Sequence, residues 1–242
     1  DLTLEAKEWK DIYKKATKET ELKHLIASTI SGKIISEFEI PTFNAGDMLA
    51  TRKAFGAVLD SIADSMPQLV GGSADLEPSN YTGNFAKTYG DFQKNNKSGR
   101  NIPFGVREFP MAAIMNGMAL HGGLIPFGGT FLVFSDYERP ALRLAAIQKV
   151  RVIHEFTHDS FYVGEDGPTH QPIEHIMSLR AIPDFNVYRP ADAKETASCI
   201  RLAIENENTP SALLLTRQGV PILSGSQKQV DANVSKGAYT LI

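Results

Sequence analysis

The sequence predicts an α/β fold in which a mostly parallel, six-stranded sheet carries helices on both faces. Short apolar runs alternate with helical stretches through most of the chain, which is the pattern of βα units. Polar residues follow every run, as they do at the carboxyl ends of parallel strands, where open α/β sheets bind ligands. The six runs are residues 68–72, 102–106, 124–128, 150–156, 185–188 and 212–215.

Helices are predicted between and before these runs. Thr51 is placed to cap a first helix, whose apolar positions are Ala54, Phe55, Val58, Leu59 and Ile62. Four later stretches are typical of helices: residues 110–120, 140–148, 172–180 and 192–206. Three of them open on a proline, a residue suited to the first helical turn.

The two ends of the chain differ from the middle. Residues 1–31 are charged and loosely amphipathic, which predicts one or two surface helices in a linker or arm. Residues 40–47 have loop chemistry, so the compact domain is expected to begin near Asp47. The chain opens on Asp1 and ends on residues 239–242, which look like the beginning of a strand. We therefore expect a fragment of a longer protein.

Composition excludes several classes of protein. With 242 residues, 42% of them apolar, the chain can form a sizeable core. Its 25 basic and 28 acidic residues are well mixed, so no extended basic face is expected to bind nucleic acid. Cys199 is the single cysteine, which favours a reducing compartment. No run reaches the roughly 20 apolar residues of a membrane span, and no leader is visible, so a cytoplasmic location is expected.

The densest group of ionisable residues is the segment 164–172, Gly-Glu-Asp-Gly-Pro-Thr-His-Gln-Pro. It follows the apolar run that ends at residues 157–160, Thr-His-Asp-Ser, so two polar clusters meet at one strand end and indicate a pocket. Their spacing matches none of the usual zinc patterns, and no metal ligand is assigned in this chain. Hydroxyl-rich substrates fit better, because carboxylates and imidazoles bind sugar hydroxyls. The ionisable residues are His154, His158, Asp159, Glu165, Asp166 and His170.

Glu108 has an apolar setting, with Phe104, Val106, Phe109 and Met111 nearby in sequence. If these side chains bury the carboxyl without a cation, its pKa should rise. A carboxyl that keeps its proton near neutrality can exchange that proton with a heterocyclic nitrogen. The alternative is an ordinary ion pair between Glu108 and its neighbour Arg107.

Phe131, Phe134 and Tyr137 recur at every third position after a glycine pair, which predicts three rings on one side of a turn or short helix. They form either an aromatic wall for a ligand or ordinary core packing. Neither phosphate-binding glycine fingerprint occurs. Any phosphate contact must then come from side chains such as Arg52, Ser79 or Arg217, each of which has the alternative role of a solvated charge or a cap.

Together these motifs closely resemble the transketolase family, in consistent order from about Thr51 to Gln218. The resemblance implies the pyrimidine-binding domain of a thiamine diphosphate enzyme over residues 47–220, an inter-domain arm at 1–46, and a linker with the start of a C-terminal domain at 221–242. The matching motifs are residues 71–76, 78–80, 105–108, 129–131, 158–160 and 164–172.

The resemblance also implies residue roles on the cofactor side. Glu108 is similar to the carboxylate that bonds the pyrimidine ring nitrogen and starts catalysis. Asp75 is similar to the acidic residue beside the cofactor at the dimer interface. The rings that resemble the pocket around the pyrimidine are Phe131, Phe134 and Tyr137.

Substrate roles are implied in the same way. Asp166 and His170 resemble the residues that address substrate hydroxyls, and His170 also the covalent intermediate. The residues that resemble the sugar-phosphate site are Arg52, Ser79, His158 and Arg217.

The implied reaction moves a two-carbon ketol unit from a ketose phosphate to an aldose phosphate, with thiamine diphosphate and Mg²⁺ or Ca²⁺. The family's diphosphate and cation ligands lie in an N-terminal domain that is absent here, and its active site lies at a homodimer interface. The fragment alone is therefore expected to be inactive. Phe109-Pro110, where the family usually has His-Ala, and Phe161-Tyr162 depart from the family pattern and put substrate preference in question. Alternatives are a dihydroxyacetone synthase, a deoxyxylulose phosphate synthase, or a non-catalytic subunit of a split transketolase.

Overall fold

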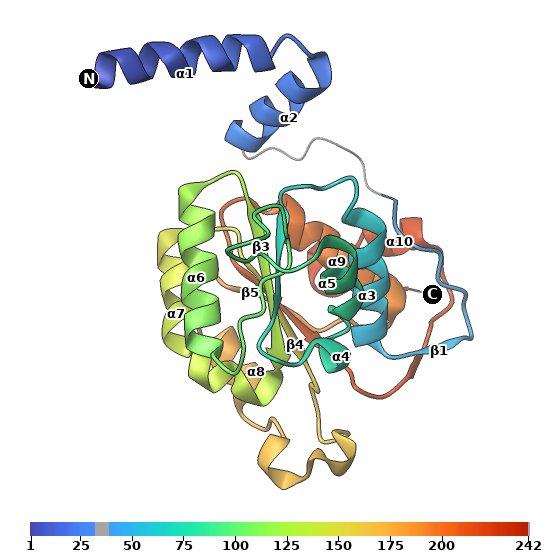
Figure 1. Ribbon diagram of the computed structural model, residues 1–242. Helices are drawn as coiled ribbons and strands as arrows, with labels where there is room; N and C mark the ends of the chain where they lie inside the picture. Colours follow the sequence, from blue (N-terminus) through green and yellow to red (C-terminus); the bar gives the residue numbers. More distant parts are fainter. Residues whose placement is uncertain (32–38, 242) are drawn as a thin grey trace.

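A parallel sheet forms the centre of the protein in a computed structural model, which describes residues 1–31 and 39–241. The strand order is β2-β3-β4-β6-β5, and helices cover both faces (Figure 1). The α/β fold is thus confirmed, with five strands in the sheet where six were predicted. The strands are β2 (Leu69–Ser73), β3 (Ile125–Phe131), β4 (Ile153–Thr157), β5 (Asn186–Tyr188) and β6 (Ser211–Leu215).

Two layers of helices enclose this sheet. One face carries α3 (Thr51–Ile62), α4 (Glu77–Asn80), α5 (Gly83–Tyr89) and α9 (Ala193–Glu205). The other carries α6 (Glu108–His121), α7 (Ser135–Gln148) and α8 (His175–Arg180). Short 3₁₀ turns lie at η1 (Leu132–Phe134), η2 (Gly164–Asp166), η3 (Pro168–His170) and η4 (Val234–Lys236).

Helix α3 buries the apolar stripe that its sequence predicts. Ala54, Phe55, Val58, Leu59 and Ile62 are all buried against the sheet and α9. The predicted cap is wrong, however, since Ala50 precedes the helix and Thr51 is its first residue. The Thr51 hydroxyl instead accepts a hydrogen bond from the backbone N–H of Thr216, which ties the start of α3 to the segment after β6.

The run 102–106 is not a strand. Asn101 makes isolated bridges to Gly71 and Asp91, and the Ile102 N–H still donates to the Gly71 carbonyl. Pro103 then has no N–H to continue a ladder, and Gly105 turns the chain at φ 68°. The run therefore leaves the edge of the sheet and leads into α6.

Two of the proline-based helix starts are also wrong. Helix α7 begins at Ser135, directly after η1, and contains Pro140 in its interior. Helix α8 begins at His175, because the residues after Gly164 form two 3₁₀ turns before it. Pro110, by contrast, lies in the first turn of α6 as predicted.

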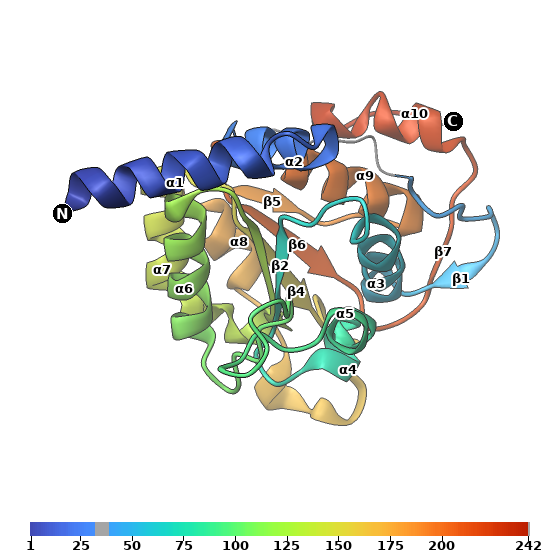
Figure 2. The same cartoon turned by 45° about the horizontal axis from the view of Figure 1, so that its top comes forward.

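The N-terminal segment consists of the two predicted surface helices, α1 (Leu2–Ala16) and α2 (Thr20–Ser31). No residue of α1 is buried, and Trp9 stacks on Tyr13 with ring centroids 5.2 Å apart. Figure 2 shows both helices across one end of the body. None of the helices in the described ranges is long and apolar enough to cross a membrane.

The C-terminal part closes over the α3 and α9 side. The segment after β6 forms β7 (Val220–Pro221), which pairs antiparallel with β1 (Met48–Leu49). It then continues into α10 (Gln227–Asp231), which packs near α9. This small pair was not predicted, because two-residue strands have no periodic signal.

Candidate functional site

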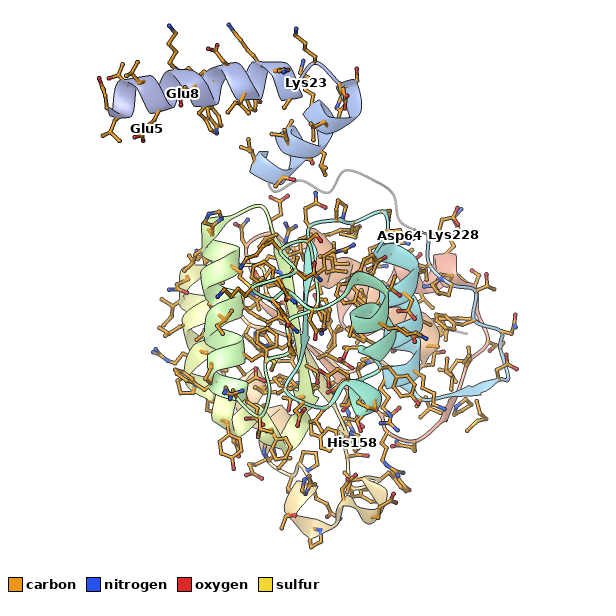
Figure 3. The ribbon with its side chains drawn as sticks, in the orientation of Figure 1. Glu5, Glu8, Lys23, Asp64, His158 and Lys228 are labelled. Carbon is orange, nitrogen blue, oxygen red and sulfur yellow. The ribbon has the colours of Figure 1, made fainter. Side chains whose placement is uncertain are left out.

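The carboxyl ends of β2, β3 and β4 are held together by a buried polar network around Asn80. The Ser73 hydroxyl donates to Asn80 Oδ1 over 2.8 Å. Asn80 Nδ2 donates to the Thr130 carbonyl over 3.2 Å and to Thr157 Oγ1 over 3.1 Å. Strand ends from three parts of the chain therefore meet at one side chain of α4, at the end of the body where His158 lies in Figure 3.

A cavity of about 620 Å³ opens at this end. It brings together residues from the ends of β2 and β3, the start of α6 and α7, and the 164–170 turns. The predicted site residues that line it are Asp75, Ser79, Glu108, Phe131, Phe134, Tyr137, Asp166 and His170. These eight residues come from separate segments of the sequence and meet at one end of the sheet.

The three predicted rings form one wall of the cavity. Phe131 and Phe134 are nearly parallel, with centroids 5.9 Å apart and 5° between their planes. Tyr137 follows, 6.1 Å from Phe134, and the His170 ring meets Phe134 edge-on at 5.3 Å. Because the rings face a cavity, they are more than core packing.

Glu108 is the first residue of α6 and reaches the same cavity, but it is only half-buried. Val106 and Phe109, expected to shield the carboxyl, are 74% and 45% exposed. These two side chains of its own segment therefore do not bury the Glu108 carboxyl. Within the described residues Arg107 makes no ion pair with Glu108, and its guanidinium donates to the Phe104 carbonyl instead.

The remaining predicted residues lie beside this cavity. Arg52 donates from Nη1 to the Ser79 carbonyl oxygen over 2.9 Å. Arg217 lies 3.4 Å from the Glu165 carboxylate. Burial lowers the pKa of His158 to about 3, and the nearby charges of Arg52 and Arg217 act in the same direction. The imidazole is therefore neutral near physiological pH.

This shift makes stability depend on acid. In the folded protein the pKa of His158 is below the ordinary value of 6.5. As the pH falls, the unfolded chain therefore binds this proton before the folded protein does. We expect the free energy of unfolding to fall as pH drops from about 6.5 toward 3. Denaturant unfolding at pH 7 and pH 5 should show a smaller loss for His158→Asn, since asparagine tolerates the φ of 60° at this position. The matched control, exposed His121→Asn, should keep the full loss; equal losses in both variants would contradict the assignment.

One cluster in the described part has the composition of a metal site, and it lies outside the predicted ionisable clusters. His175 Nε2 is 3.1 Å from Asp136 Oδ2, while its other nitrogen is 3.9 Å from Glu174 Oε2. The two carboxylates thus face opposite nitrogens of one ring. This arrangement ties the start of α7 to the start of α8.

Three ionisable side chains of α7 and β4 are fully buried and were not predicted to be. Glu138 of α7 and His154 of β4 are fully buried and paired, with 3.0 Å between Oε2 and Nδ1. Glu155 points to the opposite face of β4 and is also fully buried. A strand covered on both faces has no alternation of polar and apolar residues, so nothing in the local pattern indicates their burial.

Known proteins match the chain over this region. The family model described as "Transketolase, pyrimidine binding domain" matches residues 47–222. A transketolase of Geobacillus stearothermophilus is 54% identical over 223 residues, which cover 91% of this chain and 33% of that protein. The chain thus spans about a third of the length of the curated relatives it matches.

Solved structures agree. A transketolase from Leishmania mexicana has a TM-score of 0.92 at 42% identity, covering 99% of this chain and 36% of that one. A transketolase from Pichia stipitis, solved in complex with sedoheptulose 7-phosphate, has a TM-score of 0.90 at 42% identity over 98% of this chain and 36% of that one.

A more distant structure is a split gene transketolase, described as an inactive β4 tetramer. It has a TM-score of 0.61 at 30% identity, over 74% of this chain and 55% of that one. Its fold is the same, but its TM-score, its sequence identity and the share of this chain that it covers are all lower than those of the two transketolases above. The family model over 47–222 and the close relatives across most of the sequence establish that this chain belongs to the transketolase family, as a pyrimidine-binding domain.

Proposed function

We propose that the chain is the pyrimidine-binding part of a transketolase, which moves a two-carbon ketol unit from a ketose phosphate to an aldose phosphate with thiamine diphosphate. One observation carries the proposal: a carboxylate, Glu108, lines the same cavity as three aromatic rings that follow one another along its wall. An aromatic wall with a carboxyl at the start of a neighbouring helix fits a heterocycle that has a basic ring nitrogen.

Thiamine diphosphate fits the residues present. Phe131, Phe134 and Tyr137 would hold the pyrimidine by stacking, with Asp75 at the cavity rim. When bound, the cofactor supplies a nucleophilic thiazolium carbon. The role of Glu108 is to hold a proton at the pyrimidine ring nitrogen and exchange it during the reaction. By the resemblance to the transketolase family, we assign the ligands of the diphosphate and of its Mg²⁺ or Ca²⁺ to an N-terminal domain outside this chain.

We infer the position of the sugar-phosphate substrate from the charged side chains beside the cavity. Arg52 and Arg217 are the cations beside the cavity, and the Ser79 hydroxyl and neutral His158 can bond phosphate oxygens without adding charge. Asp166 and His170 reach the cavity next to the rings, where they can bind sugar hydroxyls. The sugar phosphate in the Pichia stipitis relative supports this substrate class.

Arg217→Ala in the complete enzyme should raise KM for phosphorylated substrates by about tenfold or more, with kcat nearly kept, because the lost contact is to a phosphate that does not react. KM for the same aldose without phosphate should not change. The control is Arg143→Ala, an exposed arginine of α7 away from the cavity. An equal loss with both substrates would exclude the phosphate contact.

For the whole protein we propose a cytoplasmic homodimer with the active site between subunits, in which residues 1–46 connect an N-terminal diphosphate-binding domain to the domain at 47–220, and 221–242 lead into a C-terminal domain. On this proposal the fragment by itself is inactive. The split-gene structure supports one alternative, a non-catalytic subunit that completes a separately encoded partner. A reading frame that encodes the diphosphate-binding domain upstream of Asp1 supports the single-chain enzyme, and one that opens near Asp1 supports the split form.

A further inference from the structure

Glu155 is a fully buried carboxyl behind the proposed phosphate site. It lies in β4 between Gly129 of β3 and Leu213 of β6, and it faces the α3 side of the sheet. Neither of its carboxylate oxygens has a hydrogen-bond partner among the described residues. An ionised carboxylate left in this state would be strongly destabilising, so its protonation state needs an explanation.

The space for this carboxyl is created by a glycine. A Cβ placed on Gly129 would lie 2.7 Å from Glu155 Oε2 and 3.2 Å from the Asn80 side chain. Asn80 cannot stabilise a negative charge there, because Nδ2 already donates to the Thr130 carbonyl and to Thr157 Oγ1. The neighbours on β3, β6 and α4 therefore offer Glu155 neither a charge nor a free donor.

Arg52, from α3, is the charged group that acts on Glu155. Its Nη1 donates to the Ser79 carbonyl, whereas its Nε is buried and has no partner in the described part of the chain. Burial raises the pKa of Glu155 well above its ordinary value, and the charge of Arg52 opposes this without overcoming it. Arg52 also interacts electrostatically with Arg217 and Asp166, and Asp166 lines the cavity. The charge of Arg52 thus acts both on an inner carboxyl and on residues at the proposed substrate site.

We infer that Glu155 is a positioning residue that keeps its proton at neutral pH and thereby leaves the charge of Arg52 available to a substrate phosphate. An ionised Glu155 would pair with the unpartnered Nε of Arg52 and compete with the substrate. The inference rests on the proposed phosphate role of Arg52. It implies that phosphate affinity weakens when alkaline pH removes the proton from Glu155.

The first test is KM against pH, from pH 7 upward, in the complete, cofactor-loaded enzyme. Above pH 7 the substrate phosphate is already a dianion, since its second pKa is about 6, and His158 stays neutral. KM for an aldose phosphate should rise by about tenfold as Glu155 ionises, whereas KM for the unphosphorylated aldose should not. Glu155→Gln, which imitates the protonated acid, should match the native enzyme at pH 7 and lose the alkaline rise. A Glu155→Gln profile that follows the native one, or a large loss of affinity at pH 7, overturns the inference.

The variant Arg52→Ala shows whether a negative result concerns only the role of Glu155 or the proposed phosphate site as a whole. If Arg52→Ala raises KM for the aldose phosphate while Glu155→Gln keeps the native pH profile, the phosphate site stands and only the role of Glu155 falls. If Arg52→Ala leaves that KM unchanged, the phosphate role of Arg52 falls and the inference with it.

A second measurement needs no Glu155 variant and remains decisive if Glu155→Gln does not fold. Calorimetry of inorganic phosphate binding, repeated in buffers with different ionisation enthalpies, gives the number of protons that the enzyme takes up when phosphate binds. The native enzyme should take up protons at alkaline pH and none through Glu155 at pH 7, and Arg52→Ala should abolish the alkaline uptake. Equal uptake at both pH values, or the same uptake in Arg52→Ala, overturns the inference.

Discussion

Glu108→Gln in the complete enzyme is expected to lower kcat by about 10²–10⁴-fold with the fold retained. Glutamine keeps the shape and the hydrogen-bonding reach of the side chain, but it cannot exchange a proton. Glu108 is the first residue of α6 and only half-buried, so removal of its charge should cost little stability. The loss should therefore appear in turnover and leave the unfolding transition nearly unchanged.

Glu77→Gln is the matched control for this experiment. Glu77 is also a half-buried glutamate at the first position of a helix, α4, but it does not line the cavity of Glu108. Both variants lose the same favourable interaction with a helix N-terminus, and only Glu108→Gln loses the proposed proton exchange. Steady-state kcat at saturating cofactor and substrate distinguishes them. Near-native turnover in Glu108→Gln, or an equal loss in both, contradicts the proton role.

Local pattern was sufficient for most of the sheet. The run that became β6 is continuous and apolar because this strand is covered on both faces, and such a run can be identified without knowledge of its neighbours. The run that became β4 was identified from its β-branched and aromatic residues, although it also contains His154 and Glu155.

The run 102–106 cannot be separated by composition from the run that became β3, because β3 also contains a proline and glycines, among them Pro126 and Gly128. What differs is the backbone after Pro103, where Gly105 turns the chain at a positive φ, and local sequence did not reveal this turn.

Site residues could be predicted where they share a short motif, and not where they depend on distant partners. The spacing of Phe131, Phe134 and Tyr137 was enough to predict three rings on one side of a turn. Burial of Glu155, in contrast, depends on Gly129 and α3, and the role of Asn80 depends on three strand ends. Such environments are properties of the fold, so the sequence alone could not reveal that these polar groups are buried.

Gly71→Ala should be the most damaging substitution for stability, with a loss of roughly 3 kcal/mol or more in the free energy of unfolding. Gly71 lies in the middle of β2, in register with Phe127 of β3. An added Cβ would lie 1.9 Å from the Phe127 backbone oxygen and 2.7 Å from its ring. Neither atom can yield easily, because the backbone is part of the parallel ladder and the ring is fully buried.

Gly117→Ala provides the opposite expectation within the same fold. Gly117 is inside α6, and a Cβ there meets nothing within 4 Å, so alanine should stabilise the helix by about 0.5–1 kcal/mol. Denaturant unfolding of both variants measures these two changes in the free energy of unfolding. A Gly71→Ala variant as stable as the native protein would contradict the close approach of β2 and β3. Because β2 ends at Ser73, whose hydroxyl donates to Asn80, a shift of this strand should also loosen the rim of the site. Gly71 is thus required for the close packing of β2 against β3.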